Sequence, residues 1–300
     1  LATQAICIGP AKASDSYLNM TSILSAAVVT GAQAIHPGFG FLSENSAFAT
    51  MCEEMNIRFI GPSSTIIDLM GNKANARRTM IAAGVPVTPG SEGYISSYEE
   101  AVVQAEKIGY PVILKAAAGG GGKGMRKVYQ ENGLEAAFSQ AKAEAKAAFG
   151  DDSMYLEKII TPARHIEVQI LGDSFGNVVH LGERDCSLQR NHQKVLEESP
   201  STFISEETRK AMGDVAIRAA KHVGYTNAGT IEFLVDTEQR FYFMEMNTRI
   251  QVEHPVTEMA TGIDIVKEQL RIASGEPLSF TQDEVVITGH TIECRINAEN

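Results

Sequence analysis

Positive charge, closely spaced cysteines and long apolar runs are all scarce in this sequence of 300 residues. The net charge of −11 argues against a nucleic-acid binder, because such proteins draw much of their affinity from clustered Lys and Arg. Cys7, Cys52, Cys186 and Cys294 form no Cys-x-x-Cys pair, which predicts free thiols in a reducing compartment. No apolar run approaches the roughly 20 residues that span a bilayer, and no secretory signal opens the chain. We therefore expect a cytoplasmic protein that binds neither nucleic acid nor membrane.

The order of apolar and helical segments predicts an α/β protein built from several subdomains. A hydrophobic fraction of 44% is ample for a packed core. Residues 1–70 begin with a strand-like run at 4–8 and then alternate helices with short strands, which is typical of a parallel α/β sheet. We expect a helical linker at 71–87, a small subdomain at 88–160 and a larger domain of longer strands at 161–300. Strand-like runs lie close to both ends, so we expect a fragment of a longer enzyme.

Residues 243–256 are the most informative segment. Polar side chains occupy every second position here, namely Glu245, Asn247, Arg249, Gln251 and Glu253. If the segment is one extended strand, these side chains all share a face, because successive residues of a strand alternate between faces. Acid, amide and base groups along one line can hold a metal, an anion and a proton acceptor. The segment therefore predicts a row of catalytic and ligand-binding residues along one face of a strand.

A predicted hairpin places a second acid beside this row of residues. Residues 229–236 and 240–247 read as strands around a short polar turn, which places Glu232 at or within one position of Glu245. Opposed residues have Cβ atoms about 4.5–5.5 Å apart, and two carboxylates at that separation repel unless a cation lies between them. Carboxylate and amide oxygens favour Mg²⁺ or Mn²⁺ over zinc. The alternative is a pair of solvated glutamates, which the apolar neighbour Phe233 disfavours.

The small subdomain contains a glycine-rich run, Gly119–Gly124, between two expected strands. It lacks the Walker A pattern, but it resembles a flap that could close over phosphates, with Lys73 and Lys115 as phosphate contacts. A flexible linker is the alternative interpretation. The helix that follows is expected to take Asn132 as its N-cap and to stop at Gly150.

Three further segments have both a functional and a plain structural interpretation. The glycine-rich loop at 36–45 either lines a ligand site or only forms tight turns. The polar strand end at 155–158 could offer backbone groups to an adenine edge, although an ordinary strand end is the simpler interpretation. Residues 183–194 read as a charged loop, which could converge on an anion but by composition more often lies on a solvated face.

Together these segments resemble the biotin carboxylase family in order and spacing. The resemblance is carried by Gly71–Lys73, Lys115 with Gly119–Gly124, Tyr155–Lys158, His165–Gln169, Glu183–Lys194, Gly229–Phe233, Glu245–Pro255 and Glu293–Ile296. The run Met246–Met259 is more similar to the biotin carboxylases of bacterial acetyl-CoA carboxylase than to pyruvate carboxylase. The resemblance implies an ATP-grasp fold, with a partial N-terminal doubly wound parallel-sheet domain and a small mobile lid. It also favours the functional interpretation of residues 183–194.

The resemblance implies a role for each candidate residue. ATP is expected at Lys73, Lys115, Gly121, Gly122, Glu157, Lys158, Ile160, His165, Gln189, His192, Leu234, Glu232 and Glu245. Two Mg²⁺ or Mn²⁺ ions are expected at Glu232, Glu245 and Asn247. Bicarbonate is expected at Lys194, Arg249, Gln251, Val252 and Glu253, with Glu253 accepting its proton. Arg295 is expected beside the ureido oxygen of biotin, and the expected catalytic residues are Lys194, Arg249, Glu253 and Arg295.

The implied activity is the carboxylation of biotin by ATP and bicarbonate through carboxyphosphate, the first half-reaction of acetyl-CoA carboxylase in malonyl-CoA and fatty acid synthesis. The implied partners are a biotinylated carrier protein, a carboxyltransferase component and, at full length, a second copy in a homodimer. The alternatives are another ATP-grasp ligase resembling half of carbamoyl-phosphate synthetase, the biotin carboxylase part of pyruvate or propionyl-CoA carboxylase, and a nucleotide-binding fragment without turnover. Ala118 and Lys123 depart from the glycine and arginine common in the family.

Overall fold

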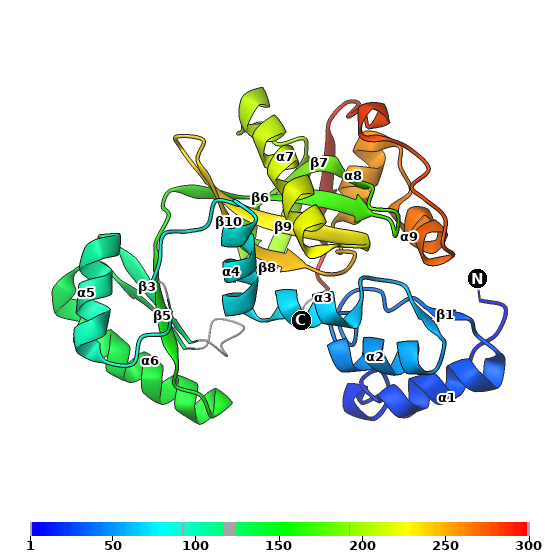
Figure 1. Ribbon diagram of the computed structural model, residues 1–300, viewed down its shortest axis with the longest axis horizontal. Helices are drawn as coiled ribbons and strands as arrows, with labels where there is room; N and C mark the ends of the chain where they lie inside the picture. Colours follow the sequence, from blue (N-terminus) through cyan, green and yellow to red (C-terminus); the bar gives the residue numbers. More distant parts are fainter. Residues whose placement is uncertain (1, 92, 117–123, 192, 299–300) are drawn as a thin grey trace. The chain divides into compact units, whose positions relative to one another are not determined.

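A computed structural model describes residues 2–91, 93–116, 124–191 and 193–298 of the chain (Figure 1). The chain divides into two compact units. The larger unit comprises Leu1–Val85, Arg164–Val235 and Met244–Asn300, and the smaller unit comprises Pro86–Ala163 and Asp236–Phe243. Among the described residues, no helix has the length and apolar character needed to cross a bilayer.

The N-terminal part of the larger unit combines helices with one short parallel strand pair. Its helices are α1 (Met20–Thr30), α2 (Ser46–Glu54), α3 (Ser64–Gly71) and α4 (Lys73–Ala82). Strand β1 (Ala34–Ile35) pairs in parallel with β2 (Arg58–Phe59), which confirms the expected parallel arrangement. Asparagine side chains cap three of the helices, because Asn19, Asn45 and Asn72 each accept a hydrogen bond from a first-turn N–H. The strand expected at residues 4–8 is not formed.

The smaller unit is a three-stranded antiparallel sheet with two helices. Strands β3 (Val112–Ala116), β4 (Met125–Val128) and β5 (Met154–Lys158) lie in the order β4-β3-β5, together with α5 (Tyr98–Ile108) and α6 (Leu134–Phe149). A core that includes Val112, Leu114 and Leu156 lies within this unit. The prediction that Asn132 caps α6 is wrong, because Asn132 lies in a preceding 3-10 turn and the N-cap is Gly133. Gly150 does end the helix in the left-handed region.

The main sheet of the larger unit has six strands in the order β10-β9-β6-β7-β8-β11. Their bounds are β6 (Ala163–Gly172), β7 (Val178–Arg190), β8 (Gln193–Ser199), β9 (Asn227–Asp236), β10 (Phe241–Asn247) and β11 (Thr291–Cys294). The helices of this part are α7 (Glu206–Val223), α8 (His254–Thr261) and α9 (Ile265–Ala273) (Figure 1). Glu183 bonds to Arg209 of α7, whereas the next residue, Arg184, bonds to Thr257 of α8. Because successive strand residues alternate faces, α7 and α8 cover opposite faces of β7.

Coverage on both faces explains why one sequence prediction is wrong. Residues 183–194 are not a loop, because β7 continues to Arg190 and β8 begins at Gln193. Their charged members Glu183, Arg184 and Asp185 are buried among polar partners, so a polar run can lie inside a sheet.

The predicted strand over 243–256 also ends early, at Asn247. Pro255 then occupies the first turn of α8, where its fixed φ and missing N–H suit a helix start. Helix α9 follows α8 closely, and Gly262 in the left-handed region separates the two.

Candidate active site

Glu232, in the middle of β9, is the carboxylate around which the site is arranged. It is 4% exposed, yet it accepts hydrogen bonds from His165 at 2.6 Å, Asn247 at 2.7 Å, and Lys194 and Gln251 at 3.0 Å each. Burial by itself raises the pKa of this carboxyl, but the hydrogen bond from His165 and the charge of Lys194 lower the pKa overall. The Glu232 side chain is therefore held as a carboxylate.

Lys194, near the start of β8, joins three carboxylates. Its ammonium lies 2.5 Å from Glu167, 3.0 Å from Glu232 and 2.7 Å from Glu253. Burial lowers the pKa of Lys194, but the negative charges of Glu167 and Glu232 outweigh that effect and raise it. One cation thus connects the Glu232 side of the site to the Glu253 side.

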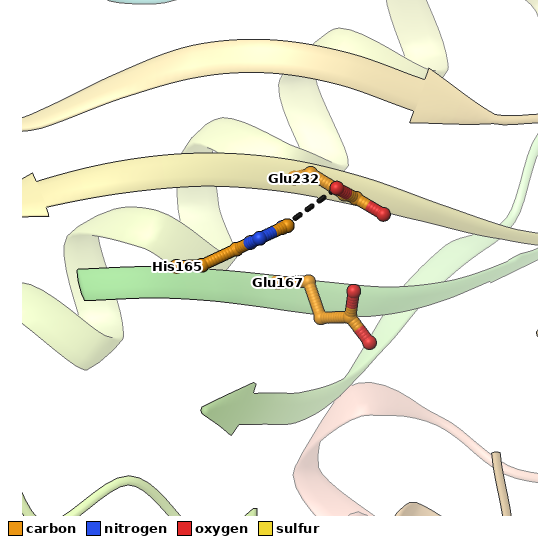
Figure 2. Close-up of side chains that lie close together, drawn as sticks. All are labelled: His165, Glu167 and Glu232. Carbon is orange, nitrogen blue, oxygen red and sulfur yellow. Dashed lines mark hydrogen bonds and ion pairs between the residues drawn. The ribbon is translucent and has the colours of Figure 1, made fainter. Parts of the chain in front are cut away.

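His165, on β6, points toward Glu232 on the neighbouring strand β9 (Figure 2). Its Nδ1 lies 2.8 Å from the amide nitrogen of Gln189, which also donates to the carbonyl of Cys186. Because that amide nitrogen is a donor, His165 carries its proton on Nε2, toward Glu232. Burial lowers the pKa of His165, and the bond to Glu232 raises it overall. The structure therefore brings these predicted ATP residues together, with the half-buried Leu234 also on β9.

Arg184, on β7, was missed by the sequence argument and is fully buried. Its five N–H groups reach five acceptors, namely Glu167 at 2.6 Å, Gln251 at 2.7 Å, Gln169 at 2.8 Å, Thr257 at 2.9 Å and Thr230 at 3.2 Å. With its oxygen held by Arg184, Gln251 turns its amide nitrogen toward Glu232 and Glu167. The alternation of His165, Glu167 and Gln169 along β6 was the signal available for this cluster.

Arg249 connects the site to the glycine-rich loop at 36–45. Its Nε donates to Glu44 at 2.9 Å, and its Nη2 donates to Asn247 at 3.0 Å. Glu44 also accepts from the backbone N–H of Thr248 at 3.1 Å. This loop therefore contacts the residues that follow β10, and Glu44 is a second site residue that the sequence argument missed.

Glu253 and Arg295 form the other side of the site. Glu253 is 3% exposed; one of its oxygens contacts Lys194 and the other accepts from Arg295 at 2.8 Å. Arg295 follows β11 and also forms an ion pair with Glu197 at 2.6 Å. Val252, which precedes Glu253, is half-buried. The carboxylate of Glu253 therefore lies between two cationic side chains, each of which contacts one of its oxygens.

The predicted metal ligands are Glu232 in the middle of β9 and Glu245 and Asn247 at the end of β10. Asn247 contacts Glu232, and the ammonium of Lys73 is 3.8 Å from Glu245. Burial, followed by the nearby charge of Glu232, raises the pKa of Glu245. Two neighbouring carboxylates fit the oxygen ligands that Mg²⁺ or Mn²⁺ prefers, whereas the amide oxygen of Asn247 accepts from Arg249.

A second group consists of His165, Glu167 and Glu232 (Figure 2). One possible ligand atom from each of these residues lies within 4.8 Å of the other two. Here Arg184 and Lys194 already compensate Glu167. This group therefore has less need of a metal ion than the Glu245 side.

The smaller unit carries the remaining predicted ATP residues that the structure describes. Lys115 on β3 pairs with Glu157 on β5. Lys158 donates to the carbonyls of Gly109 at 2.9 Å and Tyr110 at 2.7 Å, and Ile160 is half-buried. Gly121, Gly122 and His192, and with them most of the expected flap, lie outside the described residues.

Comparison with known proteins gives a consistent picture. Residues 1–67 match the model of the biotin carboxylase N-terminal domain, and residues 72–281 match that of the carbamoyl-phosphate synthase L chain ATP-binding domain. The chain is 58% identical over its whole length to biotin carboxylase 1 of Bacillus subtilis, of which it covers 67%. It is 56% identical to the chloroplastic biotin carboxylase of Arabidopsis thaliana, of which it covers 56%.

Solved structures agree with the sequence comparisons. A biotin carboxylase–beta-gamma-ATP complex from Campylobacter jejuni matches with a TM-score of 0.94 and 55% identity, covering 100% of this chain and 67% of that one. The biotin carboxylase domain dimer of Hydrogenobacter thermophilus 2-oxoglutarate carboxylase, solved with MgADP, ADP and bicarbonate, matches with a TM-score of 0.90 and 53% identity. That match covers 97% of this chain and 64% of the domain's chain.

Proposed function

Since this chain belongs to the biotin carboxylase family, we propose that it is an ATP-dependent ligase that carboxylates biotin, using bicarbonate and forming carboxyphosphate. The observation that carries the proposal is the position of Lys194. Its ammonium contacts both Glu232, one of the expected metal ligands, and Glu253, beside Arg295. Such a cation can hold an anion between the phosphate-transfer side and the biotin side of the site.

The chain's own residues would activate bicarbonate, which is a poor nucleophile. Lys194 and Arg249 would bind its negative charge, and the amide of Gln251, held in place by Arg184, would orient it. Val252 would complete this binding site. Glu253, which Lys194 and Arg295 hold in place, would accept the bicarbonate proton.

ATP and the metal would lie on the Glu232 side. We propose that Lys73, His165, Gln189, Leu234, Glu232 and Glu245 contact ATP, as do Lys115, Glu157, Lys158 and Ile160 of the smaller unit, together with Gly121, Gly122 and His192. Glu232, Glu245 and Asn247 would hold Mg²⁺ or Mn²⁺, which neutralises charge during phosphoryl transfer. The fit rests on the donor set, since two carboxylates and an amide are suitable oxygen ligands.

The finer assignments concern partners. We propose that the acceptor is biotin on a carrier protein and that Arg295 contacts the ureido oxygen. We also propose that the carboxyl group passes to a carboxyltransferase component for malonyl-CoA synthesis and that the full-length protein is a cytoplasmic homodimer. The dimer in the Hydrogenobacter thermophilus domain supports the homodimer.

A steady-state assay tests this function. We expect bicarbonate-dependent ATP turnover to rise when free biotin is added and labelled bicarbonate to appear in carboxybiotin. Arg295→Ser should keep ATP binding and lose most of the stimulation by biotin, whereas Arg58→Ser, which changes an exposed arginine of the same unit, should behave like the parent. Bicarbonate-dependent turnover that ignores biotin would instead favour an ATP-grasp ligase with another acceptor.

A further inference from the structure

Two glutamates lie directly opposite each other on β8 and β11, next to Arg295. The strand register pairs Glu197 with Glu293. Glu197 is fully buried, and among the described residues the Oε2 atom of each glutamate is buried without a hydrogen-bond partner. Directly opposed like charges destabilise a sheet, and a buried carboxylate without compensation is costly. The pair therefore needs a positive charge or a proton.

Of this pair, Arg295 directly compensates Glu197 alone, and its Nε atom has no hydrogen-bond partner among the described residues. The same nitrogen, Nη2, lies 2.6 Å from Glu197 and 2.8 Å from Glu253. The backbone N–H of Arg295 donates to the carbonyl of Val195 at 3.0 Å, which fixes this residue against β8.

The surrounding elements add as much negative as positive charge, so they leave the charge of the pair itself uncompensated. The charged groups that face the pair are Glu167 of β6, Arg184 of β7, Glu253 before α8, and Arg295 after β11. Arg184 and Lys194 are already bound to Glu167, and Lys194 also contacts Glu232 and Glu253. Among the described residues no cation forms an ion pair with Glu293, although the charges of Arg295 and Arg184 act on it, and a proton would relieve the repulsion that is left.

We propose that Glu197 and Glu293 share one proton and thereby act as positioning residues that keep the charge of Arg295 available at Glu253 and at the biotin ureido oxygen. With the proton bound, Glu197 is neutral, so Glu253 is the carboxylate that opposes Arg295. Once the pair loses that proton, Arg295 is held between two carboxylates and its charge is compensated. The proposal rests on the proposed function for its catalytic consequence, but the shared proton itself does not depend on turnover.

The titration of the two groups points the same way. Burial raises the pKa of Glu197, and Glu253 adds to the rise although Arg295 opposes it. Burial also raises the pKa of Glu293, and the charge of Glu197 adds to it. A carboxyl with a raised pKa keeps its proton to higher pH, so biotin-dependent kcat/KM should fall as pH rises through the titration of the pair.

The fall in kcat/KM at high pH is the alkaline limb of the pH profile. Two conservative variants should change this limb in different ways. Glu197→Gln removes the charge that competes for Arg295, so the limb should disappear. Glu293→Gln removes the repulsion that keeps Glu197 protonated, so the limb should move down by about one pH unit or more, as for strongly interacting sites. Glu198→Gln is the matched control, because Glu198 is the next residue of β8 and bonds to His290 at 3.0 Å instead.

The closing experiment combines these pH profiles with carbon-13 NMR titration of protein labelled at the glutamate carboxyl carbons. We expect a carboxyl titration above the ordinary glutamate range in the parent and in Glu198→Gln that is lost or shifted in Glu197→Gln and Glu293→Gln. If all four proteins give the same titrations, the shared proton is refuted even when biotin turnover is normal. If the titrations differ as expected but biotin does not stimulate turnover, the proposed function fails and the proton pair stands. Altered titrations with superimposable pH profiles would refute the link to Arg295.

Discussion

Lys194 shows how one side chain can remain charged where water is largely excluded. An isolated ammonium in such a place tends to lose its proton, because burial disfavours the charged form. Three carboxylates around Lys194 reverse that tendency. Glu245 shows the reverse case: its one lysine partner is 3.8 Å away, and burial and the nearby acid Glu232 raise the pKa of its carboxyl.

Glu245→Gln tests the metal site at this scale. The variant keeps the shape of the side chain but replaces a charged ligand by a neutral one, so affinity for Mg²⁺ or Mn²⁺ should fall on the order of 10–100-fold or more, the range that even indirect ligand contacts contribute. Calorimetric or fluorescence titration with Mn²⁺ in the presence of ATP would measure the change. Glu54→Gln, at an exposed position of α2, is the control. Equal Mn²⁺ affinity in both variants would remove Glu245 from the ligand set.

At the scale of elements, Arg184 ties together strands that are distant in the chain. Its acceptors lie on β6, β9 and α8 and in the segment between β10 and α8. A fully buried guanidinium is tolerated because each of its donors is satisfied, and this geometry also orients Gln251.

Arg184→Met should destabilise the fold by about 3–5 kcal/mol, because it leaves Glu167 as a buried charge with only part of its compensation. Thr257→Val removes one hydrogen bond to the same guanidinium and should cost about 1 kcal/mol. Urea denaturation of both variants beside the parent would give the free energies of unfolding. A loss below that of Thr257→Val would show that the Glu167–Arg184 pair is not needed for stability.

Asp173, between β6 and β7, makes a second link between elements. It accepts from the N–H groups of Phe175, Asn177 and Leu278 and from the Asn177 amide. Burial raises the pKa of Asp173, but these bonds lower it overall. A carboxyl with a lowered folded-state pKa adds stability above its unfolded pKa of about 3.9 and loses it as the pH falls through the lower folded value.

Asp173→Asn should therefore cost about 2 kcal/mol near neutral pH, and its difference from the parent should shrink in acid. Denaturant unfolding at several pH values down to about 3 would follow this difference. Asp214→Asn, which alters an exposed pair with Lys210, should cost only a few tenths of a kcal/mol at any pH. A constant difference for Asp173→Asn across the pH range would contradict the assignment.

At the scale of the whole molecule, the chain has two compact units that each contain their own buried core. The larger unit is assembled from three separate segments of the chain, and it contains the contact between Arg249 and Glu44 across 205 residues. The proposed bicarbonate and biotin residues all belong to this larger unit.

Leu156→Ala tests whether the two cores respond separately. Leu156 of β5 is fully buried in the smaller unit, so its truncation should cost about 2–5 kcal/mol there. Hydrogen exchange followed by mass spectrometry should show faster exchange in β3 and β5, while β7 and β9 keep the rates of the parent. Val103→Ala, at a residue of α5 that is 62% exposed, should leave hydrogen exchange in both units at the rates of the parent. Equal acceleration in both units would mean that they open as one.

What the sequence by itself determined is local. The end of α6 at Gly150 and the hairpin of β9 and β10 follow from periodicity, capping and turn chemistry within short windows. The hairpin contains Glu232 and Glu245. Tertiary structure alone decided that Arg184 is buried, that Glu44 meets Arg249 and that Glu197 opposes Glu293. Burial and strand register depend on which distant segments pair, and no local pattern of residue types carries that information.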